Sequence, residues 1–464
     1  MMRDVKRKTR IFVFVQNTLV FITIWLVFCH SSEAQKVKAF PDAQGFGAYA
    51  IGGRGGALFL VTTLEDYGKG ETPIEGSLRA AIEAEGPRMV LFKVGGIIEL
   101  KAPLVVRNPY LTLAGQIAPW QGICLKNYGL QIRETHDVVI RYLRVRPGDE
   151  MGEELDAISI NKSQNVILDH CSASWGTDET LSVTGVGTDR ITVQWCMIAE
   201  SLNQSVHKKG AHGYGSLIRT DGRVSFHHNL YAHHTTRVPR PGTYGDKSGL
   251  LDFQHNVIYN WKSMPGYSRA DSVRMNLVGN YYKPGPSTTG KDYIFQIGGQ
   301  TSLIYASDNI LEGVEQGWDD WVLIEGRGWW NWIFGLDDYK LTQPIAVAPV
   351  LKEKTKEMYF DVLRFAGVSL QMRDAVDRRI MAELEKGEGR IINSQKDVGG
   401  WPTYESGRSF SDRDGDGMPD RWEKLHKLDA EDGEDHSKDA DGDGYTNLEE
   451  FLNGTVPILF EKYN

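Results

Sequence analysis

Cysteine is scarce in this chain. Its 464 residues contain four cysteines, too few for a small scaffold held together by several disulfides. Three of them, Cys124, Cys171 and Cys196, lie beyond the first 34 residues, and an odd number leaves at least one of them unpaired within the chain. We therefore expect the stability of the fold to come from packing or from bound metal.

One long apolar run stands at the N-terminus. A basic head at residues 3–10 precedes Ile11–Phe28, and small residues at 32–34 suit a signal peptidase. We expect residues 1–34 to be a signal peptide and the mature chain to be secreted, extracellular or periplasmic, without stable membrane insertion. Two alternatives stay open. One is a membrane anchor, although polar residues 16–18 interrupt the run; the other is a surface lipoprotein through Cys29, although Phe28 is bulky for the preceding position.

Strong positive charge is absent. The formal net charge is −9, and residues 410–464 alone carry 16 Asp and Glu against 6 Lys and Arg. The middle of the chain is therefore nearly neutral and has no basic stripe of the kind that binds nucleic acid. The apolar fraction of 41% is sufficient for a sizeable core, which argues against extensive disorder.

A short pattern of alternating apolar and polar residues returns six times. Its copies are NVILDHC (165–171), RITVQWC (190–196), RVSFHHN (223–229), LLDFQHN (250–256), RMNLVGN (274–280) and LIYASDN (303–309). Their last residues are 25, 33, 27, 24 and 29 positions apart, which leaves room for two more short strands but rarely for a crossover helix. The spacing predicts an all-β fold, the three-strand coil of a parallel β-helix, over residues 35–370. A β-sandwich is the alternative, but its strands recur about every 8–12 residues.

The last residue of each repeat supports this stacking. Four copies end in asparagine, at positions 229, 256, 280 and 309. Equivalent side chains on stacked coils lie about 4.8 Å apart, so asparagine amides can hydrogen-bond along the stack. Cys171 and Cys196 hold the same position in earlier coils, and we expect stacked buried thiols, with a disulfide between coils as the alternative.

Segments on both sides of the repeats are expected to cover the coils. GSLRAAI (76–82) predicts a short helix that covers the first coil, because an open β-helix end exposes strand edges. MRDAVDRRIMAELEKGEG (372–389) has helical spacing and ends in glycine. We expect it to form an amphipathic helix in a helical and loop segment, residues 371–409, packed on the solenoid.

Two acidic segments near the C-terminus, DRDGDGMPDRWE (412–423) and DADGDGYTNLEE (439–450), match the EF-hand-type loop. Each has acids at positions one, three and five, glycine at six and glutamate at twelve, a set suited to Ca2+. The predicted metal ligands are Asp412, Asp414, Asp416, Asp420, Glu423, Asp439, Asp441, Asp443, Asn447 and Glu450. Because so many carboxylates repel one another without a cation, residues 410–456 are predicted to be a calcium-binding module, with a solvated acidic linker as the alternative.

This pair of loops resembles the dockerin-like or thrombospondin type 3-like calcium repeats of secreted bacterial polysaccharide enzymes. The resemblance implies a structural or tethering module that docks to another protein or a cell surface. It implies no catalytic role.

The middle of the chain carries a second resemblance. EELDAISI (153–160) leads into SQNVILDHC (163–171), followed by WGTDETLSV (175–183) and, in a later coil, HHTTRVPRPG (233–242). In combination these segments resemble polysaccharide lyase family 1, the secreted bacterial pectate lyases, and the likeness reaches DVGGWP (397–402). It implies a right-handed, pectin lyase-like β-helix and calcium-dependent β-elimination of polygalacturonate, an acidic plant polysaccharide. We expect the enzyme to act as a monomer.

The acids in these segments have a geometric reason to share an ion. Asp156 and the pair Asp178-Glu179 are separated by about one coil, and side chains on adjacent coils about 4.8 Å apart can both reach one Ca2+ at about 2.3–2.6 Å. By resemblance, Glu154, Asp156 and Asp178 are calcium ligands. Ser182 stands where the relatives carry another Asp, which leaves Glu179 as a candidate substitute. Turn and cap residues are the alternative for each of these acids.

Arg237 matches the arginine that the resemblance places near the C5 proton of the uronate. It would remove this proton or, more conservatively, clamp the substrate carboxylate, since free arginine is not a base. Lys209 matches the substrate-binding lysine, with Lys208 as the alternative. Gly242 stands where relatives often have a second arginine, so Arg240 is the candidate for that carboxylate contact.

Other functions remain as alternatives. A pectin lyase would act on methyl-esterified substrate without the calcium acids, and a non-catalytic β-helical protein would only bind carbohydrate. A hydrolase would need several carboxylates and water, and the repeats carry no Asp-Asp pair beside the arginine segment. Asp169 and His170 are expected to be structural. The histidines at 227, 228, 233 and 234 repeat as coil residues without a zinc framework.

Overall fold

The computed structural model describes residues 36–456, apart from 245–246, 248, 270–271, 299–300, 316, 318, 327–334, 371, 406 and 408. Lys38 and the residues after it belong to one compact unit. The predicted signal peptide and Cys29 lie outside the described residues. Within the described part of the chain, no helix has both the length and the apolar character needed to cross a membrane.

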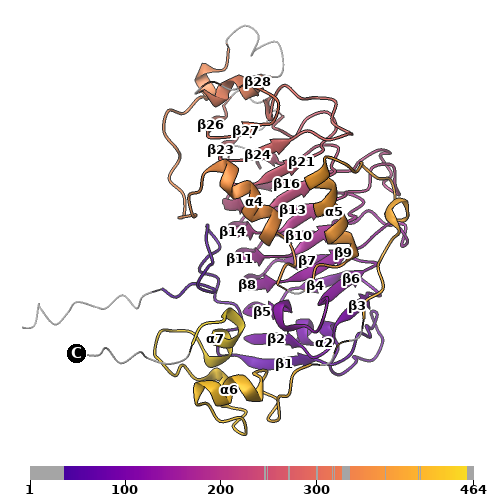
Figure 1. Ribbon diagram of the computed structural model, residues 1–464, viewed down its shortest axis with the longest axis vertical. Helices are drawn as coiled ribbons and strands as arrows, with labels where there is room; N and C mark the ends of the chain where they lie inside the picture. The colour runs from indigo at the N-terminus through magenta and orange to yellow at the C-terminus, as the bar shows by residue number, and fades with distance from the viewer. Residues whose placement is uncertain are drawn as a thin grey trace, which may run out of the picture. The chain divides into compact units, whose positions relative to one another are not determined.

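Three parallel sheets run side by side along this unit, and each coil of the chain contributes strands to them in turn (Figure 1). Sheet A has ten strands: β1 (Ala57–Val61), β2 (Arg88–Phe92), β5 (Leu111–Ala114), β8 (His136–Arg141), β11 (Gln164–Asp169), β14 (Asp189–Gln194), β17 (Arg223–His227), β20 (Leu250–Gln254), β23 (Arg274–Val278) and β26 (Leu303–Ser307). Six of these, from β11 to β26, are the six repeats. The predicted right-handed parallel β-helix is confirmed.

The other two large sheets supply the remaining sides of the coil. Sheet B consists of β3 (Gly96–Glu99), β6 (Ile123–Lys126), β9 (Leu143–Arg146), β12 (Ser172–Ser174), β15 (Met197–Ala199), β18 (Leu230–Ala232), β21 (Val257–Tyr259), β24 (Tyr281–Lys283) and β27 (Ile310–Leu311). Sheet C consists of β4 (Leu104–Val106), β7 (Leu130–Arg133), β10 (Ile158–Asn161), β13 (Leu181–Gly185), β16 (Leu217–Thr220) and β19 (Arg240–Gly242). A short fourth sheet joins β22 (Gly266–Tyr267), β25 (Phe295–Ile297) and β28 (Ile324–Gly326).

The core is formed by alternate residues of each strand. In β11, Leu168 pairs with Ile140 of β8 and Val193 of β14, and all three side chains are fully buried in one apolar cluster. The intervening residue Ile167 points to the outer side, where it packs in a different cluster. Because equivalent positions lie side by side on successive coils, one apolar residue per repeat builds a continuous core.

The predicted asparagine ladder lies at the turn from sheet A to sheet B. The Asn229 amide donates to Asn256 Oδ1 (2.9 Å), and the Asn256 amide donates to Asn280 Oδ1 (3.0 Å). Asn280 continues the ladder to Asn309 (2.9 Å), whose amide donates to Asp320 (2.9 Å). The ladder therefore ties four consecutive coils together. The three described cysteines are free buried thiols, so the stacked-thiol interpretation holds and the disulfide alternative is wrong.

The residue before each ladder position has a left-handed backbone. His170, Trp195, His228 and His255 have φ between 51° and 55°. Their rings stack in sequence, with centroids 6.0, 4.4 and 5.2 Å apart. These histidines are thus part of the turn architecture, and burial lowers the pKa of His255 to about 4.

Helix α2 (Leu78–Glu83) is the short helix predicted at 76–82. Ser77 caps it by accepting from the Ala80 N–H. Leu78, Ala81 and Ile82 are buried in the solenoid core, so α2 covers the apolar interior at the first coil.

Two helices cover the outer face of sheet B. Helix α4 (Thr355–Phe365), which the sequence did not predict, and α5 (Ala375–Lys386), which lies within the predicted 372–389, pack on Met197, Leu230 and Val257. The boundaries drawn at residues 370 and 410 remain predictions, because segments on both sides pack on the same solenoid.

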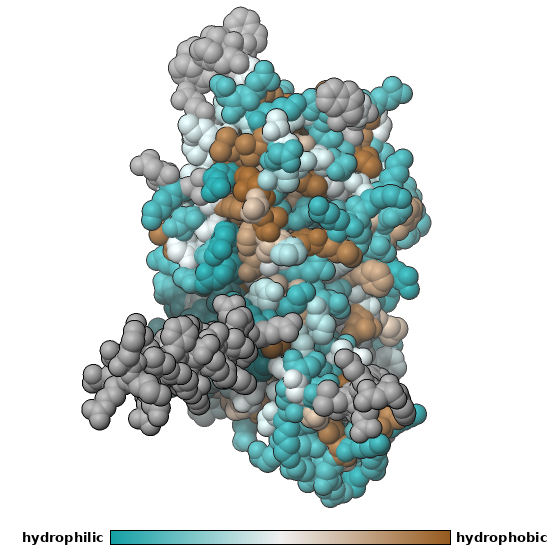
Figure 2. All heavy atoms as spheres, turned by 90° about the vertical axis from the view of Figure 1, so that its left-hand side faces the viewer, coloured by the Kyte–Doolittle hydropathy of each residue, from teal (hydrophilic) through white to brown (hydrophobic). Residues whose placement is uncertain are grey.

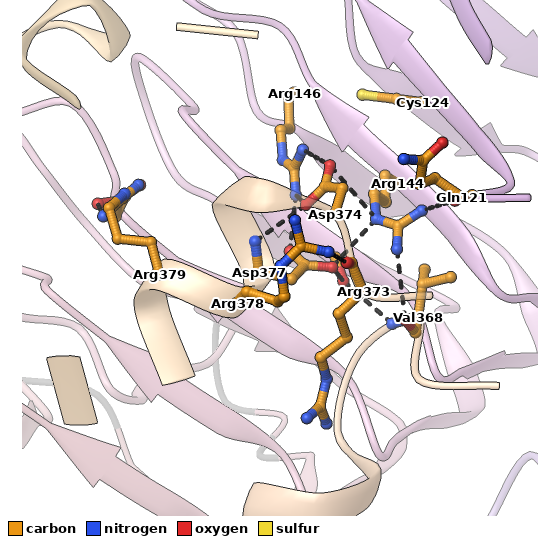
Figure 3. Close-up of polar contacts among 12 residues, drawn as sticks. Gln121, Cys124, Arg144, Arg146, Val368, Arg373, Asp374, Asp377, Arg378 and Arg379 are labelled. Atoms are coloured by element: carbon orange, nitrogen blue, oxygen red, sulfur yellow. Dashed lines mark hydrogen bonds and ion pairs between the residues drawn. The ribbon is translucent and has the colours of Figure 1, made fainter. Parts of the chain in front are cut away.

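A buried ionic cluster holds the start of α5 on sheet B (Figure 3). Arg146 of β9 contacts Asp374 (2.5 Å) and Asp377 (2.6 Å), and Arg144 contacts Asp377 (3.0 Å). Both arginine side chains are fully buried. Burial alone would raise the pKa of Asp374, but the two guanidinium groups hold it well below its usual range, so the cluster stays ionised and fixes the helix.

The outer face of sheet A is covered by segments from both ends of the described chain. Residues 39–50 pack on β8 and β11 through Val139 and Ile167. The C-terminal helices α6 (Asp420–His426) and α7 (Asn447–Asn453) lie beside β1 and β2 (Figure 1). Their apolar side chains contact Met89, Leu91 and Ala114.

Candidate functional site

Four successive coils bring the predicted site residues to one edge of sheet C. Asp156 lies just before β10, and Asp178 and Glu179 lie just before β13. In the next coils, Glu179 forms a parallel β-bridge with Tyr214, and Tyr214 forms one with Thr236, the residue before Arg237. The residues are therefore neighbours because they hold equivalent places before consecutive strands.

Asp156 is fixed by two hydrogen bonds from the following coil. Its Oδ1 accepts from the Glu179 backbone N–H (2.9 Å), and its Oδ2 accepts from the Ser182 hydroxyl. Burial, with the nearby charge of Asp178, raises the pKa of Asp156 to about 7 despite these bonds. Ser182 stands where an acid was expected. Its hydroxyl orients Asp156 through a hydrogen bond and adds no charge to the site.

Glu179 and Arg237 form an ion pair at the centre of the group. The Glu179 side chain is 5% exposed and that of Arg237 is 20% exposed. Burial and the carboxylates of Asp156 and Asp178 raise the pKa of Glu179 to about 8. Burial disfavours the charged form of Arg237, but Glu179 outweighs it and raises the arginine pKa, so the guanidinium is held as a cation. The guanidinium carbon of Arg237, Cζ, lies 3.9 Å from the centre of the Tyr214 ring.

Two histidines that the sequence did not single out hold Asp178. His212 Nε2 lies 2.7 Å and His207 Nε2 3.5 Å from Asp178 Oδ1, and the two rings stack with centroids 3.7 Å apart. His207 Nδ1 accepts from the Lys209 N–H (3.1 Å), so its proton is on Nε2, facing the carboxylate. Burial raises the pKa of Asp178, but the histidine contacts lower it overall. The only sequence signal was their place around the lysine pair in VHKKGAH.

The carboxylates fit a calcium ion. One oxygen from each of Asp156, Asp178 and Glu179 lies within 4.8 Å of the others. Ca2+ takes oxygen ligands at about 2.3–2.6 Å, so three such oxygens can share one ion. Burial first, and then the neighbouring carboxylates, raise the pKa of both Asp156 and Glu179, so a bound cation would favour their charged forms. Glu179, the candidate substitute, thus lies with two of the three predicted ligands, Asp156 and Asp178.

Glu154 lies beside this group without joining it. Its Oε1 accepts from the Lys208 N–H (2.9 Å), which lowers the pKa of Glu154, and its Oε2 is 3.9 Å from His207 Nε2. The side chain is exposed.

The predicted basic residues lie around the same edge. The backbones of Lys208 and Lys209 contact Glu154 and His207, and both residues are exposed. Arg240 begins β19, three positions after Arg237, and is half-buried.

The first acidic loop of the tail forms a second group of carboxylates. Asp412, Asp414 and Asp416 come within 4.8 Å of one another, as do Asp416, Glu423 and Asp435. Asp435 lies outside both twelve-residue segments and was not predicted. Asp420 lies outside these two groups, and its oxygens accept from Ser411 (2.8 Å) and Arg413 (2.9 and 3.0 Å); its role as a metal ligand stays a prediction.

The second acidic loop is more exposed. Asp439, Asp441 and Asp443 come within 4.8 Å of one another. Asn447 accepts from the Ala440 N–H (3.3 Å) and donates to the Asp435 carbonyl (2.8 Å). Asn447 therefore links the second acidic loop to Asp435, which belongs to the carboxylate group of the first acidic loop. Glu450 is buried, as a residue closing a metal shell would be.

Comparisons with known proteins point to one family. A family model described as pectate lyase matches residues 121–263, which include the acids before β10 and β13 and Arg237. A probable pectate lyase C of Aspergillus flavus is 36% identical over 435 residues, covering 91% of this chain and 95% of that protein. The one from Aspergillus fumigatus is 35% identical over 439 residues, covering 93% and 96%. These relatives are fungal, and the bacterial origin that the tail suggested stays a prediction.

Solved structures share the fold. A pectate lyase of Bacillus sp. N165 in complex with trigalacturonate matches with a TM-score of 0.51 at 14% identity, over 70% of this chain and 99% of that one. A pectate lyase bound to a hexasaccharide matches with a TM-score of 0.50 at 13% identity, over 73% and 100%.

Proposed function

The chain belongs to the pectate lyase family and is a polysaccharide lyase, and from that premise we propose that it cleaves polygalacturonate by calcium-dependent β-elimination at the edge of sheet C. The observation that carries the proposal is the convergence of Asp156, Asp178, Glu179 and Arg237 from consecutive coils. Elimination needs the C5 proton removed, the resulting enolate stabilised and the C4–O bond broken, and this group offers both charge signs at one place.

Asp156, Asp178 and Glu179 are the proposed ligands of Ca2+, with Glu154 beside them as a further candidate. When bound, the ion polarises the C6 carboxylate of the substrate and so acidifies the C5 proton. Ser182 keeps Asp156 in place, and His207 and His212 do the same for Asp178. The chain's own contribution is thus a carboxylate set oriented before substrate arrives.

Arg237 is the proposed catalytic residue. In the structure Glu179 stabilises its charged form, which favours a guanidinium that clamps the substrate carboxylate and stabilises the enolate. Removal of the C5 proton by Arg237 itself would require Glu179 to be engaged elsewhere, as it is when it serves as a metal ligand. Lys209, or Lys208, and Arg240 are proposed to bind the carboxylates of neighbouring uronates.

We keep two further proposals from the sequence. The acidic loops within 410–456 bind Ca2+, and residues 1–34 direct secretion. The unpartnered buried oxygens of the first loop support the former. Deletion of residues 1–34 should retain the protein inside the cell, and export despite the deletion would contradict the latter.

The test is the formation of unsaturated product, followed by ultraviolet absorbance, from polygalacturonate with added calcium or with EDTA. We expect activity that EDTA abolishes and Arg237→Ala removes. Arg223→Ala is the matched control, because Arg223 is an exposed arginine paired with Asp189 on sheet A, away from the site. Activity that persists in EDTA, or an Arg237 variant as active as the parent, would refute the proposal.

The same assay separates the alternatives. Activity without calcium on highly methyl-esterified pectin would indicate a pectin lyase. New reducing ends without ultraviolet absorbance would indicate hydrolysis, and binding without cleavage a carbohydrate-binding protein.

A further inference from the structure

Buried carboxylate oxygens without a partner gather in the first acidic loop. Both oxygens of Asp414 and both of Glu423 have no hydrogen-bond partner among the described residues. Glu423 is fully buried, and Asp416 and Asp435 are 1% and 4% exposed. Buried charge of one sign is costly unless a cation compensates it, and an all-oxygen set suits Ca2+.

The same loop is the surface that contacts the solenoid. A Cβ atom added to Gly417, the sixth loop residue, would lie 2.4 Å from Leu91 Cδ1. Met418, the seventh, is fully buried against Met89 and Leu91 of β2. Asp412, the first, forms an ion pair with Lys93, which follows β2. The backbone that places the metal ligands therefore also places the residues that touch β2.

The rest of the C-terminal segment extends this contact along sheet A. Leu448 and Phe451 of α7 pack in the same apolar cluster as Leu58 and Leu60 of β1. Glu449 pairs with Arg54 (2.9 Å), and Asn453 accepts from Arg141 (2.8 Å). Figure 2 shows a mostly hydrophilic surface at the foot of the view, where Figure 1 places α6 and α7. Most apolar side chains of this segment thus face the strands, whereas Leu425 of α6 is 73% exposed.

We propose that Ca2+ held by Asp414, Asp416, Glu423 and Asp435 shapes the first loop for docking on β2, so that the ion fastens the C-terminal segment over strands β1, β2 and β5. Without the cation, repulsion among the acids distorts the loop, and Gly417 and Met418 lose their fit. The inference rests on the proposed calcium binding by the tail and is independent of the catalytic site. It gives the segment a structural role within this chain in place of the tethering role that its resemblance implies.

Hydrogen exchange with mass spectrometry on the full mature chain, with calcium or EDTA, tests the proposal. We expect calcium to slow amide exchange at least about tenfold in 57–61 and 88–92 and to leave 274–278, at the other end of sheet A, unchanged. Glu423→Gln should remove this calcium effect. Asp432→Asn is the matched control, because Asp432 is an acid of the same segment that pairs with Lys438 outside the cluster. Equal exchange with and without calcium, or a full calcium effect in Glu423→Gln, would overturn the proposal.

A second variant keeps the test decisive if Glu423→Gln fails to fold. Leu91→Ala shrinks the docking surface without touching a ligand, and binding and docking that are linked must weaken together. Calorimetric titration of the tail site should show calcium affinity reduced about fivefold or more, the usual scale of such coupling. Unchanged affinity would refute the linkage. The elimination assay on the same samples is a separate readout, so lost product formation with retained calcium-dependent protection would count against the proposed catalytic function alone.

Discussion

Removal of Arg237 should have two effects that a second substitution can separate. Arg237→Ala deletes the proposed catalytic group and also leaves Glu179, whose side chain is 5% exposed, without its cation. Breaking a buried ion pair by removing one partner costs about 3–5 kcal/mol. Because Arg237 keeps 20% of its side-chain exposure, we expect the lower end, about 3 kcal/mol of unfolding free energy in EDTA, at a pH above the raised pKa of Glu179 of about 8, where its carboxylate is charged. The same variant should lose about 10²–10⁴-fold in turnover, the range for a group that moves or stabilises a proton.

The double variant Arg237→Ala with Glu179→Gln removes the unpaired charge. We expect urea denaturation in EDTA to show that it regains most of the lost stability, because a neutral amide no longer needs a counter-ion at that position. Its activity should stay lost, since neither the arginine nor the proposed calcium ligand is restored. Recovered turnover in the double variant, or a single variant as stable as the parent in EDTA, would show that the reasoning about this pair is wrong.

Three further predictions follow from other described contacts. Asp252 is 1% exposed, and burial raises its pKa from 3.8 to about 7. The native state therefore keeps this proton to higher pH than the unfolded chain does, so the unfolding free energy should fall as pH rises from 3.8 to about 7. At about 1.4 kcal/mol per pKa unit the expected fall is about 4 kcal/mol. Asp252→Asn should flatten this dependence in denaturation curves, and an unchanged slope would contradict it. Asn256→Ala breaks the ladder and leaves buried amide and carbonyl groups unpaired, which should cost about 3 kcal/mol in the same measurement, whereas a neutral effect would refute the ladder's contribution. His212→Ala removes a contact at 2.7 Å from Asp178 and should weaken calcium binding at the proposed catalytic site about tenfold by calorimetry; undiminished affinity would show that Asp178 needs no such support.

The solenoid could be predicted because its signal is local and repeated. Each repeat carries the strand pattern, and Asn229, Asn256 and Asn280 recur at the interval of one coil, so stacking follows from the sequence alone. Alternation alone would put Asp156 in phase with the core residues Ile158 and Ile160, so the pattern by itself does not place it at the site. The structure resolves this by starting β10 at Ile158, so that Asp156 lies in the preceding turn.

The missed residues lie where no periodic signal exists. His207 and His212 belong to the irregular segment between β15 and β16, and their role depends on Asp178 of an earlier coil. Asp435 lies between the two acidic loops, so loop matching could not include it. The docking of the tail joins Lys93 to Asp412, a contact between distant residues that no local pattern encodes.

The tail lies on strands that are made first. Ribosomes and export machinery deliver a chain from its N-terminus, and early segments begin to fold before later ones emerge. Here β1 and β2 present Leu58, Leu60 and Leu91 to their outer side, and the residues that cover them follow position 417. Until the C-terminal segment has been synthesised, the apolar outer face of β1 and β2 therefore stays exposed to water and to other chains. By covering this face, the segment also protects the strands that fold early against aggregation.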